Sequence, residues 1–180
     1  MLNSRVSEIE GVRATPIFSA RDSRGTFSKF NPLQELNGVL DSVAFSFNPV
    51  PGTIRGLHFQ IEPFAEEKLV TCALGAIFDV VADLRPESTT FGKWASYELN
   101  ATNCVQLYLP KGVAHGFQTL TSNSVIQYCL STPYSSENSF AINPLGNLDI
   151  TWPISEFFLS ERDASGINFS QAEKIYIDSL

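Results

Sequence analysis

The stretch Thr53-Ile54-Arg55-Gly56-Leu57-His58-Phe59-Gln60 has the composition of a β-strand and carries one of only two histidines in the chain. Arg55 precedes His58 by three residues, and Lys68 follows it by ten, at the start of the next apolar run. A base, a guanidinium and an ammonium placed this close indicate a site where a proton moves and negative charge is held. The rest of the chain can be understood from this stretch outward.

The chain has 180 residues, enough for one domain with a sizeable core, and we expect a single domain over residues 1–180. Apolar residues make up 43% and charged residues 17%, which excludes a disordered chain. Fourteen Phe and one Met favour β-structure over a helical bundle. The net charge of -7 argues against nucleic acid as a partner, because phosphate backbones require a broad basic surface.

Short apolar or alternating segments, separated by Gly, Pro, Asn or Ser, predict many strands and no long helix. The predicted strands span residues 26–30, 43–48, 53–60, 68–72, 76–84, 94–99, 105–109, 116–120 and 124–131. Asn31 and Pro32 predict one short helix over residues 32–36, with Asn31 as its cap, and a second helix is expected from Gln171. This pattern is typical of an all-β sandwich or barrel with short peripheral helices.

Neither a signal peptide nor a membrane-spanning run is visible in the sequence, so we expect a cytoplasmic protein with no membrane partner. The three cysteines, Cys72, Cys104 and Cys129, are odd in number and lack CxxC spacing. We expect each of them to be a reduced, buried thiol in a strand.

The second histidine, His115, ends a Pro-x-Gly-x-x-His sequence over residues 110–115 that resembles a cupin motif, a turn leading into a strand. The other cupin motif usually contains His-x-His and a Glu, whereas this chain has only His58 there. A two-histidine, one-carboxylate iron site from His58, His115 and either Glu66 or Glu67 stays open as an alternative. The resemblance supports a barrel and weakens the case for a metal.

A closer resemblance covers residues 15–165, nearly the whole chain, in conserved order and spacing. Its segments are Asp22-Ser23-Arg24-Gly25-x-Phe27, Arg55-Gly56-Leu57-His58-Phe59-Gln60, Lys68-Leu69-Val70-x-Cys72, residues 78–85 and 86–94, Gly112-x-Ala114-His115-Gly116-Phe117, Asp149-Ile150-x-Trp152-Pro153 and residues 159–164. Together they resemble the dTDP-4-dehydrorhamnose 3,5-epimerase family. The resemblance implies a jelly-roll fold, a homodimer without metal or cofactor, and inversion of C3 and C5 of a nucleotide-linked 4-keto-6-deoxyhexose.

The resemblance also implies roles for individual residues. His58 matches the base, and Asp163 matches the carboxylate that fixes its tautomer and stabilises the imidazolium. Lys68 matches the cation that holds the enolate charge at the C4 oxygen. Tyr134 matches the acid that returns a proton from the opposite face of the sugar.

Other positions match groups that bind the substrate. Arg24 and Arg55 match ligands of the diphosphate, which suits guanidinium forks. Phe27 is expected near the nucleobase, from its own chain or across the dimer. His115 is expected to line the same pocket, oriented by Asp83.

The sequence departs from the family in two places. Lys29 stands where the family usually has Glu. The strand before Arg55 allows two registers, and an ungapped match puts apolar side chains on the usually polar positions, namely Val43, Phe45 and Phe47. A one-residue deletion in the following turn would instead bring Ser46 and Asn48 into the pocket, and we favour it because it keeps a polar lining. We expect Ser46, Asn48 and Gln60 to bind the substrate.

These departures leave open whether the nucleotide is dTDP, CDP or GDP, and whether one or both carbons are inverted. Two other functions also stay open from the residues alone. One is a metal-dependent cupin oxygenase that uses the iron site described above. The other is a sugar-nucleotide binding module that has lost catalysis, which the presence of the whole catalytic set disfavours.

Overall fold

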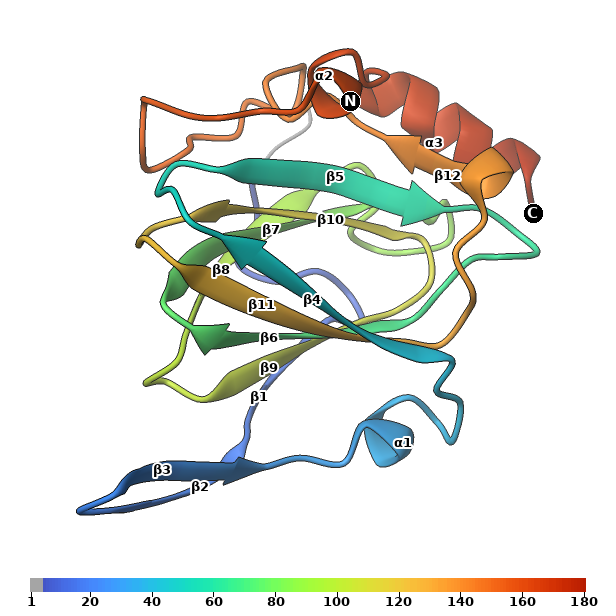
Figure 1. The fold of residues 1–180 in the computed structure, drawn as a ribbon. Helices are drawn as coiled ribbons and strands as arrows, with labels where there is room; N and C mark the ends of the chain where they lie inside the picture. The colour runs from blue at the N-terminus through green and yellow to red at the C-terminus, as the bar shows by residue number, and fades with distance from the viewer. Residues whose placement is uncertain (1–4) are drawn as a thin grey trace.

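Two facing antiparallel β-sheets of five strands each form the protein, and the computed structural model describes residues 5–180 (Figure 1). The upper sheet in Figure 1 consists, in spatial order, of β12 (Ser139–Ala141), β5 (Ile54–Gln60), β10 (Val113–Thr119), β7 (Ala76–Asp83) and β8 (Trp94–Asn100). The lower sheet consists of β1 (Arg13–Pro16), β9 (Val105–Leu109), β6 (Lys68–Leu74), β11 (Ser124–Leu130) and β4 (Ser42–Asn48). The predicted jelly-roll barrel is therefore confirmed.

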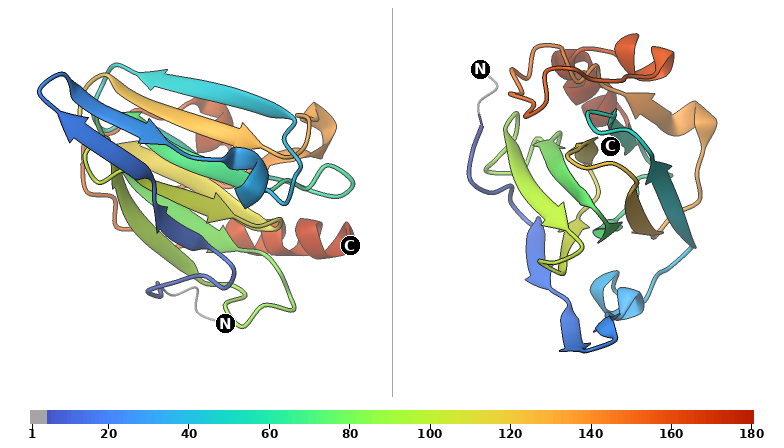
Figure 2. Two further views of the ribbon diagram at one scale, coloured as in Figure 1. Left: turned by 90° about the horizontal axis from the view of Figure 1, so that it is seen from below. Right: turned by 60° about the vertical axis from the view of Figure 1, so that its left-hand side comes forward.

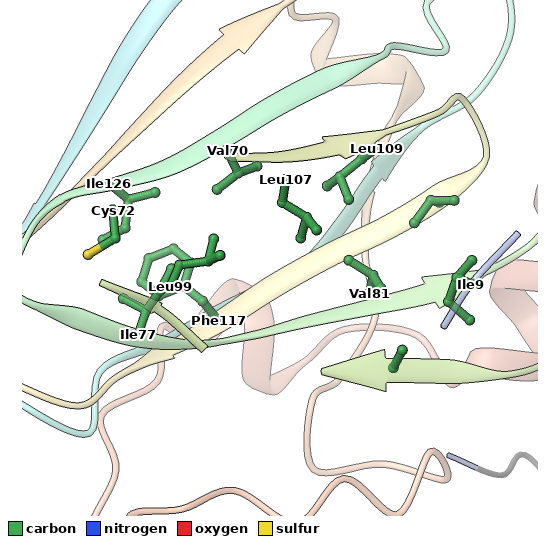
Figure 3. Close-up of a cluster of buried hydrophobic side chains, with 12 residues drawn as sticks. Ile9, Val70, Cys72, Ile77, Val81, Leu99, Leu107, Leu109, Phe117 and Ile126 are labelled. Carbon is green, nitrogen blue, oxygen red and sulfur yellow. The ribbon is translucent and has the colours of Figure 1, made fainter. Parts of the chain in front are cut away.

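The space between the two sheets holds the main hydrophobic cluster (Figure 3). Side chains alternate along each strand, so every second residue of both sheets points into this space. Its members include Val70, Leu107 and Ile126 from the lower sheet and Ile77, Val81, Leu99 and Phe117 from the upper sheet. Each fully buried side chain of this size contributes about 1.5–3 kcal/mol to folding. Phe117 belongs both to this cluster and to the wall of the pocket described below, so the core supports that pocket directly.

The helices lie outside the barrel. The short α1 (Pro32–Glu35) begins at Pro32 as predicted, but the Asn31 side chain makes no capping hydrogen bond. The C-terminal α3 (Phe169–Asp178) packs on the outer side of the upper sheet and begins before Gln171, because Asn168 and Gln171 form a capping box. The remaining helical turns are η1 (Ser136–Asn138) and α2 (Glu161–Ala164). Within residues 5–180, no helix has both the length and the apolar character needed to cross a membrane.

A hairpin of β2 (Phe18–Asp22) and β3 (Gly25–Lys29) stands apart from both five-stranded sheets. It projects from the lower end of the molecule, and the view from below shows it and α1 on the outer side of the lower sheet (Figure 2). Every residue of its two strands is exposed. The hairpin therefore contributes little to the core of its own chain.

The three cysteines are free thiols. Cys72 and Cys129 are buried in strands, as predicted. Cys104 differs from the prediction, because it is only partly buried and lies outside the strands with a positive φ of 48°.

Candidate active site

A pocket of about 250 Å³ lies between the two sheets, lined by Ser46, Arg55, His58, Lys68, His115, Phe117 and Tyr128. A second hollow of about 200 Å³ shares three of these residues and extends toward Tyr134 and Arg162. Strands β5 and β10 of the upper sheet supply one wall, and strands β4, β6 and β11 of the lower sheet supply the other. A ligand between these walls would meet different side chains on its two faces.

Two glycines set the geometry of the upper wall. A Cβ atom on Gly56, whose φ is +108°, would lie 2.6 Å from Gly116 Cα, and one on Gly116 would lie 2.7 Å from the Arg55 carbonyl oxygen. Only glycine allows β5 and β10 to approach this closely at their irregular register. His115 then lies directly opposite His58. It lies within β10 and not in a preceding turn, because β10 begins at Val113.

His58 and Asp163 form a hydrogen-bonded pair with 2.7 Å between Nε2 and Oδ1. Asp163 comes from α2, where its backbone N–H donates to the Ser160 hydroxyl, and its Oδ2 accepts from the Gly56 N–H at 3.2 Å. Burial alone would raise the pKa of Asp163, but the hydrogen bond and charge of His58, with the Gly56 N–H, outweigh it and lower that pKa. The carboxylate is therefore ionised and fixes the orientation of the His58 ring.

His115 pairs with Asp79, with 2.7 Å between Nε2 and Oδ2. The expectation that Asp83 orients His115 is wrong, because Asp83 is bound by the Arg85 Nε at 2.8 Å instead. Burial raises the pKa of Asp79, which is 0% exposed, and the charge and hydrogen bond of His115 offset this only in part. The chain thus places two histidine–carboxylate pairs at one pocket.

Lys68 opens β6 and points into the pocket from the lower sheet. Its Nζ lies 3.0 Å from Glu66 Oε1, and both side chains are only 10% exposed. An ammonium in such a dry setting interacts more strongly with a developing negative charge than a surface lysine does. The lysine is thus suited to holding an enolate oxygen.

The alternative iron site is not assembled. His58 and His115 are each paired with an aspartate, and Glu66 is paired with Lys68. Glu67 accepts a hydrogen bond from the Tyr108 hydroxyl. In the part of the chain that the structure describes, no three His, Cys, Asp or Glu side chains gather as metal ligands would.

Tyr128 is a pocket residue that the sequence did not single out. It is half-buried on β11, lines both hollows, and meets the His115 ring edge-on at 6.1 Å between centroids. Burial and the nearby Asp79 charge raise its pKa, so the phenol stays protonated at neutral pH. Strand alternation could have indicated that Tyr128 points inward, because it lies on the same face of the strand as the core residue Ile126.

Tyr134 lies on the loop after β11, at the rim of the second hollow, and is 65% exposed. Its hydroxyl accepts a hydrogen bond from Arg162 Nη1 at 3.4 Å. Arg162 is a further cation that the sequence analysis did not identify, although it directly precedes Asp163. Gln60 also lines this hollow, but its side-chain amide is bonded to backbone groups of the loop that carries Tyr134.

The β4 strand has the register that the one-residue deletion predicts. Ser46 lines the pocket, and Asn48, which is 1% exposed, accepts a hydrogen bond from Arg55 Nε at 2.8 Å. The alternate residues of β4 are exposed on the outside of the sheet, namely Val43, Phe45 and Phe47.

Arg24 and Phe27 do not join this site within the chain. Both lie on the projecting hairpin, where Arg24 pairs with Asp22 at 2.6 Å and Phe27 is 65% exposed (Figure 1). Neither residue lines the pocket of its own chain, and their expected contact with the nucleotide stays a prediction.

Fold and pocket together define a cupin-type barrel whose interior carries two histidine–aspartate pairs and a buried lysine. Comparison with known proteins adds the family. The dTDP-4-dehydrorhamnose 3,5-epimerase family model matches residues 6–171, and the chain belongs to that family.

Individual relatives agree with this assignment. The dTDP-4-dehydrorhamnose 3,5-epimerase of Sinorhizobium fredii is 49% identical over 118 residues, which are 63% of this chain and 60% of that protein. The dTDP-4-dehydrorhamnose 3-epimerase of Streptomyces niveus is 36% identical over 68% of this chain and 60% of its own length. The matched region thus spans about three fifths of these curated relatives. A crystal structure of the Bacillus anthracis 3,5-epimerase with TDP and PPi bound superposes with a TM-score of 0.82 at 36% identity, over 88% of this chain and 94% of that one.

Proposed function

We propose that this protein is an epimerase that acts on a nucleotide-linked 4-keto-6-deoxyhexose at C3, C5 or both. One observation carries the proposal: a histidine–aspartate pair on one wall of the pocket faces a buried lysine and a protonated tyrosine on the other. Inversion of a carbon beside a ketone requires a base, a group that stabilises the enolate and an acid on the opposite face, and these residues can fill all three roles. The family membership of the chain supports the same reaction.

The chemistry follows from the acidity of hydrogens beside a carbonyl group. His58 removes the proton from C3 or C5, and the electron pair of the broken C–H bond moves into an enolate centred on the C4 oxygen. Lys68 holds that oxygen in a site where charge is weakly screened. A proton then reaches the same carbon from the opposite face, which restores the ketone with inverted configuration.

We assign the acid to Tyr128 in place of Tyr134. Tyr128 comes from the sheet opposite to His58, so the base and the phenol can address the two faces of one sugar ring. Its raised pKa keeps the proton available. Tyr134 has a more exposed position at the rim, and we assign it to the wall that contacts the bound sugar nucleotide.

Positively charged groups around the two hollows suit a diphosphate. Arg55 is exposed at the first hollow and Arg162 at the second, and Lys68 lines both. Guanidinium groups bind phosphate oxygens through paired donors. In a chain of net charge -7, these residues give the pocket a local attraction for an anionic substrate.

We further propose a homodimer in which the hairpin of each chain reaches the nucleotide bound by its partner. Arg24 and Phe27 are the residues expected to bind nucleotide, and the β2–β3 hairpin that carries them projects away from the barrel of its own chain (Figure 1). Phe18, Phe27 and Phe45 are 66%, 65% and 66% exposed, and such large apolar surfaces are typical of interfaces.

Incubation with dTDP-4-keto-6-deoxyglucose in deuterium oxide tests the reaction, with NMR and mass spectrometry to locate the label. We expect deuterium at both C3 and C5, and no label with His58→Asn. Deuterium at one carbon alone would mark a mono-epimerase, the activity that the Streptomyces niveus relative is named for. Nucleotide binding without label at either carbon would overturn the assignment in favour of an inactive binding module.

A further inference from the structure

We propose that Gln60 is a positioning residue that holds the Tyr134 loop at a fixed distance from the base, His58. The inference rests on the proposed function, because it assigns Tyr134 to the wall of the substrate site. It differs from the expectation that Gln60 binds the substrate, because its amide group is already occupied by the protein.

Gln60 is 4% exposed, and its side-chain amide makes three hydrogen bonds to the backbone. Its Nε2 donates to the carbonyl oxygens of Phe64 at 3.1 Å and Pro133 at 3.3 Å. Its Oε1 accepts from the Ser135 N–H at 2.7 Å. Both the donor and the acceptor of the amide are thus satisfied inside the chain.

Two of these partners flank Tyr134 directly. Pro133 supplies a carbonyl oxygen on one side of it, and Ser135 supplies an N–H on the other. One side chain therefore fixes the backbone on both sides of an exposed tyrosine. Loops held by few contacts open easily, so a clamp at this point decides where the Tyr134 ring lies.

The clamp connects the loop to the catalytic strand. His58 and Gln60 lie two residues apart on β5, so they share one face of the strand. A second brace comes from Arg162, which donates to the Tyr134 hydroxyl at 3.4 Å and to Ser139 Oγ at 3.0 Å. Arg162 is adjacent to Asp163, the partner of His58. The His58–Asp163 pair and the Tyr134 loop are thus connected in two ways, through Gln60 and through Arg162.

Hydrogen exchange tests the clamp without any reference to activity. Gln60→Met keeps the approximate length of the side chain and removes both polar atoms. We expect faster amide exchange at Ser135 and its neighbours, with His58 and α2 unchanged. Gln118→Met is the matched control, because Gln118 is also fully buried and its amide bonds the backbone N–H and carbonyl of Ile154. It should speed exchange near Ile154 and leave Ser135 protected.

Kinetics test whether Gln60 acts through Tyr134. We expect Gln60→Met to lower kcat/KM by about 10- to 100-fold, mainly by raising KM, because a misplaced wall weakens substrate binding. In a Tyr134→Ala background the same change should cost less than threefold, because the residue that it positions is gone. Gln118→Met should have the same effect with or without Tyr134.

The outcomes are distinct. Unchanged exchange at Ser135 in Gln60→Met would overturn the clamp, whatever the enzyme does. Equal losses of kcat/KM in the wild-type and Tyr134→Ala backgrounds would show that Gln60 does not act through Tyr134. If the wild-type protein exchanges no substrate hydrogen at all, the proposed function fails, while the exchange measurement still decides on the clamp.

Discussion

The two aspartates that hold the pocket histidines differ in how their charge is supported. Asp163 accepts hydrogen bonds from His58 and the Gly56 N–H, and its pKa is lowered. Asp79 is bound only through Oδ2, its Oδ1 has no partner in residues 5–180, and burial raises its pKa. The anionic form of Asp163 is therefore stabilised by its surroundings, whereas burial destabilises the anionic form of Asp79.

A titration of carboxyl carbons by NMR should show this difference. We expect Asp163 to titrate below about 3.9, the value for an unstructured Asp, and Asp79 to titrate above it. The ionised Asp163 then contributes stability above the unfolded pKa, and this contribution is lost as pH falls through the folded pKa. Asp79 contributes with the opposite sign, favouring the fold below the unfolded pKa and losing that as pH rises. Asp163→Asn and Asp79→Asn identify the signals, and the reverse order of midpoints would contradict the prediction.

The roles of Tyr128 and Tyr134 can be distinguished by replacing each with Phe, which removes only the hydroxyl oxygen. Loss of a general acid costs about 10²- to 10⁴-fold in rate, so Tyr128→Phe should lower kcat by that amount. Proton abstraction by His58 should persist, seen as deuterium washed into recovered substrate. Tyr134→Phe should change KM more than kcat. If Tyr134→Phe abolished turnover and Tyr128→Phe did not, the acid would be Tyr134.

At the scale of elements, the approach of β5 to β10 is the feature that aligns the histidines. We expect Gly116→Ala to destabilise the fold by about 1–3 kcal/mol, because its Cβ would lie 2.7 Å from the Arg55 carbonyl oxygen. Urea unfolding measures the loss. Gly146→Ala is the control, since its Cβ would come no closer than 3.1 Å to the Asn143 carbonyl oxygen in a loop. Equal stability of both variants would show that the strand approach is not under steric constraint.

Alternation and turn residues were sufficient to predict most of the barrel strands, because each long strand buries one face. β12 was missed since its three residues show no period, and it exists only by pairing with β5. The choice between Asp79 and Asp83 could not be made from sequence, because both lie on the same face of β7. Asp83 is not available to His115 because it is bound by Arg85, which follows two residues later, just after the strand ends.

At the scale of the whole molecule, the pairing of His58 with Asp163 spans 105 residues, and only the family resemblance pointed to it. Local patterns carry no information about which distant turn returns to a strand. The same limit applies to the hairpin, since no property of residues 18–29 in the sequence shows that they leave their own barrel. Strand alternation puts Tyr128 on the inner face of its sheet, but its place opposite His58 follows only once the facing sheet is known.

Mixed dimers test the proposed exchange of hairpins. One chain carries both Arg24→Ala and Phe27→Ala, which remove the hairpin's part of a shared site. The other chain carries His58→Asn, which removes the base from the pocket. Because one of the two sites in a mixed dimer would then be intact, co-refolding should restore activity toward half of the wild-type level per mixed dimer. Light scattering on the wild-type protein gives its mass in solution. A monomer, or no restored activity, would contradict the shared site.

Strand β4 has one face in the pocket, through Ser46, and the other outside, through Phe45 and Phe47. A slip of one residue in the pairing of β4 with β11 would exchange these faces. It would put phenylalanines into the pocket and polar groups on the exposed surface in a single step. Replacement at Ser46 therefore changes one side chain of the pocket at a time, whereas a slip of the strand would change the character of the whole wall.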